Sequence, residues 1–268
     1  FNNKFLTTFL TQNEHYLFFY ERNKFKSNKT DLRIEAISIL KKLDKDGFCI
    51  VNNFWDEDKC LEGIKEVEKI MINYPKYLHS DNKSDLRVFG AENISSEIGS
   101  FSKNNLLNEI ANEYNKKNTQ LGFTLGAKIY YRPNNKGSGE GWHRDGFYRQ
   151  FKALLYLNDV GIRNGPFQLI KDSHKCRNLI KDIKKADLKY MQYRLSEDEI
   201  SKLISNNPSR LRTILGKKGT LILVDTSMLH RGAPIKEGYR YVLTNYYYTN
   251  NQIDKELYKR FNVVPKNL

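Results

Sequence analysis

The stretch Tyr239-Arg-Tyr-Val-Leu-Thr-Asn-Tyr-Tyr-Tyr248 is dominated by aromatic and β-branched residues, which favour β-strands. Further segments on its N-terminal side share this composition, and turn-forming residues such as Arg163-Asn-Gly-Pro166 separate them. These segments are Leu86–Phe89, Leu125–Tyr131, Phe151–Leu157, Pro166–Ile170 and Thr220–Val224. From about residue 85 onward the chain is therefore predicted to be mainly β.

A polar segment at residues 181–218 interrupts these strands. Inside it, Ser196-Glu-Asp-Glu199 has the form of a capping box, in which a Ser and a Glu three residues apart cap the start of a helix. We expect residues 181–218 to form a helical insertion between two strands.

Two helices are predicted ahead of the strands. Apolar residues recur at three- and four-residue steps in Asp31–Asp44 and again in Asp56–Asn73, and Phe48-Cys-Ile-Val-Asn52 between them has the composition of a strand. Helices followed by a run of strands predict an α+β fold, mainly β, built as a sandwich or double-sheet barrel. No linker divides the chain, so we expect one domain over residues 31–268, with an appended segment at residues 1–30.

The composition excludes several classes of protein. Hydrophobic residues make up 39% of the 268 and aromatic residues 13%, which is too much for a disordered polyelectrolyte. The longest apolar runs, such as Leu221–Val224, fall far short of the roughly 20 residues that span a bilayer, so no membrane partner is expected. Three cysteines without CxxC spacing argue against a disulfide framework and favour a cytoplasmic location.

The excess of positive charge has three interpretations. Lys and Arg outnumber Asp and Glu by 45 to 31, a formal net charge of +14. Such an excess is found in nucleic-acid-binding proteins, in enzymes that act on anions, and in proteins with a Lys-rich solvated surface. No RNP-type motif, zinc finger or concentrated basic run is present, so we expect no nucleic-acid partner, and a basic nucleic-acid-binding protein is the rival hypothesis.

Two histidines and one aspartate are candidates for a metal site. In Gly141-Trp-His143-Arg-Asp145-Gly146, residues i and i+2 of an extended segment point to the same side, so one imidazole and one carboxylate can reach a single ion. His230, which follows the strand Thr220–Val224, is the natural third ligand. Two His and one carboxylate leave three metal positions open, as in non-haem Fe(II) oxygenases, whereas a structural zinc site takes four ligands, usually with thiolates.

Arg240 lies ten residues after His230, on the predicted strand Tyr239–Tyr248, with Val242 and Thr244 on the same face. A guanidinium inside a barrel needs a partner, because an unpaired buried charge is costly. The far carboxylate of a dicarboxylate co-substrate would be one, through a bidentate pair. The alternative is a surface arginine on an edge strand.

Taken together, these residues resemble the phytanoyl-CoA dioxygenase family of Fe(II)/2-oxoglutarate-dependent oxygenases. The resemblance covers roughly residues 31–250 and rests on the order of His143-x-Asp145, His230 and Arg240. Connecting segments are similar as well: Asp46–Phe54, Leu155–Val160, Asn164–Gln168, Asp172–Lys175 and Gly219–Asp225. One departure is Asp172, which stands where Gly is usual and is expected to alter a turn but no ligand.

The resemblance implies a double-stranded β-helix core of the jelly-roll or cupin type, with the N-terminal helices packed on it. It implies that His143, Asp145 and His230 bind Fe(II), that O2 is a co-substrate, and that 2-oxoglutarate chelates the metal and pairs with Arg240. Gly232 stands where relatives often have a hydroxyl residue. The candidates for secondary contacts with 2-oxoglutarate are Thr244, Lys128 and Tyr130, and ordinary sheet packing is the alternative for Lys128 and Tyr130.

The expected reaction is hydroxylation of an unactivated C–H bond of a small, anionic metabolite, with release of succinate and CO2. Asp145 favours hydroxylation, because related halogenases have a small residue in its place. Desaturation, epimerisation and cyclisation at the same site are the alternatives. The candidate contacts for an anionic substrate are the basic residues near the metal motif, Arg149, Lys152 and Arg132, and exposed solubilising charge is the alternative for them. His174 is expected at a turn near the mouth of the site and not as a ligand.

Overall fold

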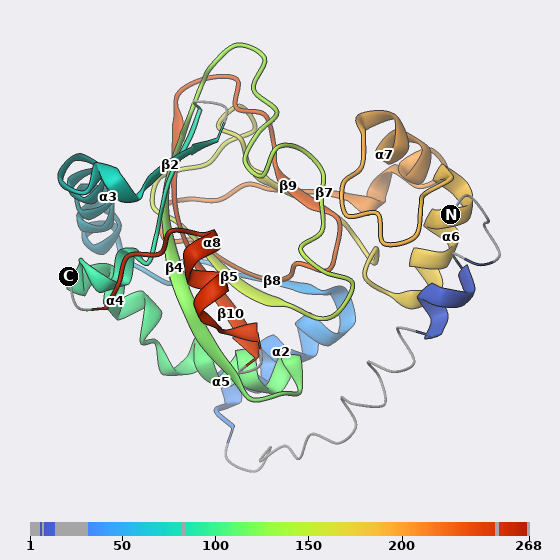
Figure 1. The fold of residues 1–268 in the computed structure, drawn as a ribbon, viewed down its shortest axis with the longest axis horizontal. Coiled ribbons are helices and arrows are strands. Elements are labelled where there is room, and N and C mark those ends of the chain that lie inside the picture. The colour runs from blue at the N-terminus through green and yellow to red at the C-terminus, as the bar shows by residue number, and fades with distance from the viewer. Residues whose placement is uncertain (1–5, 7, 14–31, 82–83, 250–251, 267–268) are drawn as a thin grey trace.

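The computed structural model describes residues 6, 8–13, 32–81, 84–249 and 252–266, and most of the expected N-terminal segment 1–30 lies outside these residues. The described strands form two antiparallel sheets (Figure 1). In the larger sheet the order is β1 (Phe48–Val51), β8 (Leu221–Asp225), β5 (Phe151–Tyr156), β10 (Tyr239–Thr249), β4 (Thr119–Tyr130), β3 (Asp85–Phe89) and β2 (Leu78–Asp81). The smaller sheet consists of β7 (Leu211–Ile214), β6 (Phe167–Ile170) and β9 (His230–Gly232). This pair of sheets confirms the predicted jelly-roll core.

Strand β10 lies in the middle of the larger sheet, between β5 and β4. Val242 pairs with Tyr156 of β5 and with Ala127 of β4, and all three side chains pack in the cluster inside the barrel. Leu243, the next residue, belongs to the cluster on the opposite face of the sheet. Side chains of β10 thus alternate between the barrel interior and the outer face, as the period of two requires.

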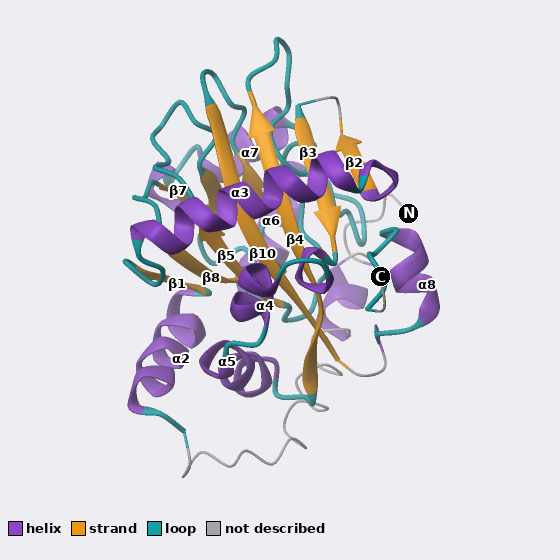
Figure 2. Ribbon diagram, turned by 90° about the vertical axis from the view of Figure 1, so that its left-hand side faces the viewer, coloured by secondary structure: helices purple, strands orange, loops and turns teal. Residues whose placement is uncertain are grey.

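Helices cover the outer face of the larger sheet. Figure 2 shows α3 (Glu57–Asn73) running across it, with α2 (Ile34–Asp46), α4 (Ser96–Ser102) and α5 (Asn105–Asn115) below. Helix α2 ends at Gly47, whose φ of +79° is a left-handed conformation that glycine adopts without strain. Helix α3 starts at Asp56, whose carboxylate accepts a hydrogen bond from the Lys59 amide at 2.8 Å. Both helices predicted from the sequence are therefore present.

Helices α4 and α5 fall in a region where we expected only strands and turns. Leu107, Ile110 and Tyr114 of α5 are buried at helical spacing, and the Asn104 side chain accepts from the Leu107 amide at 3.2 Å to start the helix. The periodic signal was present in the sequence, but the many Asn residues between the apolar positions resemble a loop.

The expectation of a helical insertion at residues 181–218 is only partly correct. Helices α6 (Cys176–Ala186) and α7 (Glu197–Ile204) are present, and Ser196 and Glu199 form the capping box in both directions. Residues 211–214, however, form strand β7, which pairs with β6 in the smaller sheet. Four residues are too few to show the alternating pattern of a strand in the sequence. The segment becomes a strand because it pairs with β6.

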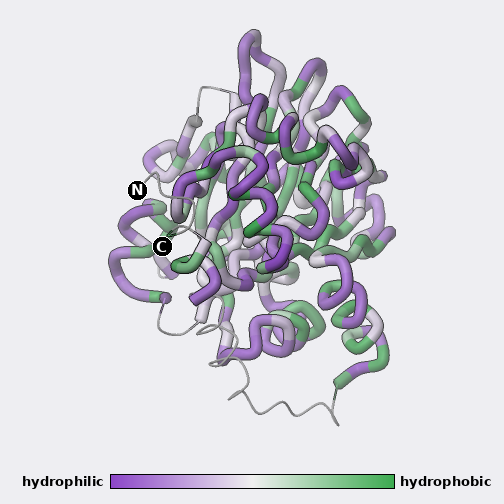
Figure 3. The backbone as a smooth tube through the Cα atoms, turned by 90° about the vertical axis from the view of Figure 1, so that its right-hand side faces the viewer, coloured by the Kyte–Doolittle hydropathy of each residue, from purple (hydrophilic) through white to green (hydrophobic). Residues whose placement is uncertain are grey.

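Helix α8 (Lys255–Arg260) lies on the barrel side of the larger sheet (Figure 1). Short 3-10 turns occur at Pro75–Tyr77 (η2), Ala91–Asn93 (η3) and Pro208–Arg210 (η4). Hydrophobic stretches follow the interior strands, whereas loops and helix surfaces are mostly hydrophilic (Figure 3). Across the described residues, no helix combines the length and apolar character needed to traverse a bilayer. Asp172 has a φ of +63°, so this position does occupy a glycine-like turn.

Candidate metal centre

The backbone brings His143 and His230 side by side. The His143 amide donates to the His230 carbonyl at 3.0 Å, and the His230 amide donates to the His143 carbonyl at 2.8 Å. Two residues later, the Asp145 amide donates to the Thr226 carbonyl at 3.0 Å. These hydrogen bonds hold the loop before β5 against the segment around β9. The three predicted ligands therefore lie together, although His230 comes 87 positions after His143 in the sequence.

The three side chains can hold one metal ion. Asp145 Oδ1 is 3.9 Å from His143 Nε2, and Asp145 Oδ2 is 3.7 Å from His230 Nε2. One ligand atom from each residue lies within 4.8 Å of the other two. An octahedral ion with bonds of about 2.1 Å would draw neighbouring ligand atoms to about 3 Å, so a small contraction completes the site.

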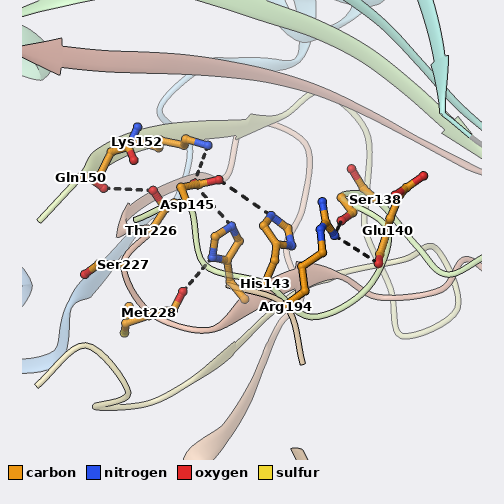
Figure 4. A network of polar contacts seen from close by, with 12 residues as sticks. Ser138, Glu140, His143, Asp145, Gln150, Lys152, Arg194, Thr226, Ser227 and Met228 are labelled. Atoms are coloured by element: carbon orange, nitrogen blue, oxygen red, sulfur yellow. Dashed lines mark hydrogen bonds and ion pairs between the residues drawn. The ribbon is translucent and has the colours of Figure 1, made fainter. Parts of the chain in front are cut away.

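Each imidazole is oriented by a backbone carbonyl. His143 Nδ1 is 2.9 Å from the Gly141 oxygen. His230 Nδ1 is 2.9 Å from the oxygen of Met228, where Figure 4 draws the contact as a dashed line. A carbonyl can only accept, so each Nδ1 carries the proton and each Nε2 presents its lone pair to the centre of the cluster. Metal-binding histidines are commonly oriented in this way.

The electrostatics of the cluster keep its members in metal-binding forms. Burial acts to raise the pKa of Asp145, but the charge of Lys152, joined at low pH by His230 and His143 in their protonated forms, outweighs it and holds that pKa well below its usual range. Burial, reinforced by His143, lowers the pKa of His230 to about 3, and burial also lowers the pKa of His143. At neutral pH the carboxylate is ionised and both imidazoles are neutral.

The cluster forms part of the wall of a cavity of about 610 Å³ inside the barrel. Alternate residues of three strands line it: Leu125 and Ala127 from β4, Lys152, Leu154 and Tyr156 from β5, and Arg240, Val242, Thr244, Tyr246 and Tyr248 from β10. A cavity of this size is typical of a small-molecule site.

Arg240 and Thr244 both face this cavity, as predicted from their spacing. The Arg240 side chain is buried, and its Nε and Nη1 have no hydrogen-bond partner among the described residues. Burial lowers the pKa of Arg240. Gly232 makes room for this guanidinium, because a Cβ at residue 232 would lie 2.7 Å from Arg240 Nη2. A hydroxyl side chain at residue 232 would thus collide with the arginine in its present position.

Lys128 and Tyr130 do not line the cavity. Their neighbour Ile129 pairs with Arg240 and faces inward, so Lys128 and Tyr130 point to the other side of the sheet. Lys128 Nζ is 2.6 Å from Glu68 on α3, and the Tyr130 hydroxyl accepts from Arg132 at 2.9 Å. The prediction that these two side chains contact 2-oxoglutarate is therefore wrong. Both pack on the outer face of the sheet, which was the alternative.

Of the three predicted substrate contacts, the structure brings only Lys152 into the cavity. Arg149 pairs with Asp44 at 2.9 Å and donates to the Tyr114 carbonyl at 3.0 Å. Arg132 is exposed and lies over the Tyr130 ring. Both point away because they belong to segments just outside β5 and β4, where the chain turns off the barrel wall.

Other polar residues line the cavity that sequence reasoning missed. Arg194 comes from the segment between α6 and α7, Gln252 and Arg260 from the C-terminal segment, and Glu140 from the loop before the metal motif. Arg194 Nη1 donates to the Gly139 carbonyl at 2.8 Å (Figure 4). No local pattern marks these residues, because only the path of the chain brings them to the cavity. His174 is not among the lining residues, in agreement with its predicted exclusion as a ligand.

Most of the chain matches a known protein family. Residues 43–238 match the family model described as Phytanoyl-CoA dioxygenase (PhyH). No sequence among the curated proteins matches the chain.

Several solved structures share the fold. The epimerase SnoN from nogalamycin biosynthesis, in complex with Fe3+, alpha ketoglutarate and nogalamycin RO, is 13% identical, with a TM-score of 0.61 over 87% of this chain and 91% of that chain. EctD from S. alaskensis with bound Fe is 18% identical, with a TM-score of 0.61 over 86% of this chain and 82% of the EctD chain. HygX from Streptomyces hygroscopicus with nickel and 2-oxoglutarate bound is 14% identical, with a TM-score of 0.57 over 82% of this chain and 88% of the HygX chain. At these identities the likeness establishes the fold.

Proposed function

Because the chain belongs to the phytanoyl-CoA dioxygenase family of Fe(II)- and 2-oxoglutarate-dependent oxygenases, we propose that it hydroxylates a C–H bond of a small anionic molecule. In this reaction one atom of O2 enters the substrate and the other enters succinate, as 2-oxoglutarate loses CO2. The observation that carries the proposal is that the His143, Asp145 and His230 cluster shares one cavity with Arg240, whose Nε and Nη1 have no hydrogen-bond partner among the residues that the structure describes.

The donor set of the cluster suits Fe(II). Two neutral imidazole nitrogens and one carboxylate oxygen are the ligands of the facial triad, which leaves three positions for other groups. His143, Asp145 and His230 would hold the ion, and iron with 2-oxoglutarate would supply the activation of O2. The residues that line the cavity would orient the reactants around this ion.

Arg240 is proposed to bind the far carboxylate of 2-oxoglutarate. Within the described part of the chain its Nε and Nη1 are buried donors without hydrogen-bond partners, and an arginine can donate two parallel hydrogen bonds to one carboxylate. Thr244 lies four residues along the same face of β10 and is proposed to add a hydroxyl contact. Held at this end, 2-oxoglutarate would direct its 2-oxo acid end toward the histidines.

The remaining cavity is proposed to bind the substrate through Arg194 and Arg260. Cationic side chains outnumber acidic ones along the cavity, where Asp145 and Glu140 are the lining carboxylates. Among the described residues, no carboxylate lies within ion-pair distance of Arg194 or Arg260. Aromatic rings of Tyr246, Tyr248 and Phe261 line the same space. A molecule with one anionic group and an apolar body would match both features.

Epimerisation is the second candidate. SnoN, which shares the fold at low identity, is described as an epimerase and was solved with nogalamycin RO, whereas EctD was solved with 2-oxoglutarate and 5-hydroxyectoine. The two outcomes differ in the product, because hydroxylation adds one oxygen atom and epimerisation leaves the mass unchanged.

The proposed function is tested by following succinate. We expect purified protein with Fe(II), 2-oxoglutarate and O2 to form succinate, and a library of small anionic metabolites to contain compounds that stimulate it. We expect Asp145→Ala to lower succinate formation by at least 100-fold, because the ion loses one of its protein ligands. Product mass then separates hydroxylation from epimerisation. Undiminished succinate formation by Asp145→Ala would refute the assigned site.

A further inference from the structure

Lys152 is a buried cation beside the proposed metal site that the reaction outlined above does not use. It lies on β5 and is 5% exposed. Its Nζ is 2.7 Å from Asp145 Oδ2 and 3.8 Å from the centre of the Tyr246 ring. Figure 4 shows the ammonium and the imidazole of His143 on different sides of the carboxylate.

The buried ammonium of Lys152 needs a partner that offsets the cost of its burial. Removing a charged amine from water is costly unless a partner compensates it. Among the described residues, Asp145 supplies the only carboxylate within ion-pair distance of Lys152. At 2.7 Å the ammonium and the carboxylate form an ion pair, which compensates the buried positive charge. The lysine is therefore an ionised partner of a proposed metal ligand.

The contact distinguishes the two oxygens of the carboxylate. Oδ2 lies 2.7 Å from Lys152 Nζ and 3.7 Å from His230 Nε2, whereas Oδ1 lies 3.9 Å from His143 Nε2. The ammonium therefore engages one of the two oxygens that face the histidines. A carboxylate that gave both oxygens to the metal would occupy two coordination positions. Only a carboxylate that gives one oxygen leaves the three open positions that 2-oxoglutarate and O2 require.

We propose that Lys152 is a positioning residue: its ammonium holds one oxygen of Asp145, so that the carboxylate gives the metal a single oxygen and a coordination position stays free. This inference rests on the proposed function. It predicts that loss of the ammonium weakens metal binding. Residues that orient a metal ligand commonly contribute about 10- to 100-fold to the metal affinity, and we expect an effect of that size here. If the lysine acted only through its charge, its removal would instead strengthen the binding of a cation.

The test measures anaerobic binding of Fe(II), alone and with 2-oxoglutarate. The visible charge-transfer band of the Fe(II)–2-oxoglutarate complex reports chelation at two adjacent positions and does not depend on turnover. For Lys152→Met, which has similar length but no donor, we expect roughly 10- to 100-fold weaker Fe(II) binding and a weakened or shifted band. For Lys152→Arg, which retains charge and donors, we expect the band to be restored.

Lys128→Met is the matched control. Lys128 also pairs with a carboxylate, at 2.6 Å, but it does so on the outer face of the sheet. Its variant is expected to bind Fe(II) and to show the band as wild type does. Wild-type affinity with an unchanged band in Lys152→Met would overturn the inference, as would tighter binding.

Failure of the proposed function is a separate outcome. In that case the wild-type protein itself would bind no Fe(II). Thermal unfolding of each variant establishes that it is folded. Should Lys152→Met not fold, Lys152→Arg carries the test, and loss of Fe(II) binding in that folded variant would contradict the proposed role.

Discussion

Arg240 carries a positive charge into the interior of the barrel. It is buried, and two of its nitrogens have no hydrogen-bond partner among the described residues. A guanidinium does not lose its proton in a protein, so the charge must be compensated or remain costly. The absence of a side chain at Gly232 leaves the space that the guanidinium occupies. The far carboxylate of 2-oxoglutarate is the anion that we propose to compensate this charge.

Replacement of Arg240 by alanine is expected to raise the KM for 2-oxoglutarate by at least about 30-fold, since loss of a bidentate charge pair costs about 2 kcal/mol or more. The KM for the organic substrate should change much less. Steady-state kinetics with each reactant varied in turn measure the difference. Arg149→Ala is the control, because Arg149 pairs with Asp44 outside the cavity. Equal effects of Arg240→Ala on both KM values would count against its role.

At the scale of elements, the C-terminal segment 252–264 closes one side of the cavity. Phe261 stacks among the rings of Phe89, Phe123 and Tyr246 at centroid distances of 4.9, 5.1 and 6.5 Å. The Val264 amide donates to the Phe89 carbonyl at 2.9 Å. The family match ends at residue 238, so this wall belongs to the part of the chain that the match does not cover.

Phe261→Ala is expected to lower the free energy of unfolding by about 2 kcal/mol, because a half-buried ring is lost from an aromatic cluster. Urea denaturation monitored by circular dichroism measures it. Lys259→Ala on α8, the helix that ends just before Phe261, is the control, since its exposed pair with Glu256 contributes about 0.5 kcal/mol or less. The wall would not depend on Phe261 if both variants unfolded at the same urea concentration.

For the molecule as a whole, one partly buried acid, Glu92, makes stability depend on pH. Glu92 follows β3 and accepts a hydrogen bond from the Thr124 amide of β4 at 2.8 Å. Burial raises the pKa of Glu92 to about 7. The folded protein therefore retains a proton that the unfolded chain loses at lower pH. This favours the folded state at low pH, and the advantage is lost as the pH rises from about 4.5 to about 7.

Glu92→Gln is expected to unfold at higher urea concentration than wild type at pH 8, with a gain of about 2 kcal/mol, and to differ little from it at pH 5. The amide retains an acceptor for Thr124 and carries no charge to desolvate. Urea midpoints of both proteins at several pH values measure the difference. Glu62→Gln, on the exposed surface of α3, is the control and should show no such pH dependence. A constant difference between Glu92→Gln and wild type across pH would contradict the assignment.

Local patterns in the sequence were sufficient for the main elements and for the residues of the metal cluster. Side chains i and i+2 of an extended segment share a side, so His143 and Asp145 were paired from spacing alone. The order of His230 and Arg240 behind them carried the family resemblance, which the match over residues 43–238 confirms. Strand β7 and helices α4 and α5 were not predicted, because their local sequence signals are short or obscured by polar residues.

Tertiary structure alone decided which faces and which distant segments form the cavity. Lys128 and Ala127 are adjacent, and a shift of one residue in strand register exchanges the inner and outer faces. Only the pairing of β4 with β10 places Ala127 inside and Lys128 against Glu68. Arg194 and Arg260 reach the cavity through the path of the chain. Ligand chemistry and spacing are local properties of a sequence, whereas the partners of a buried charge depend on every element packed around it.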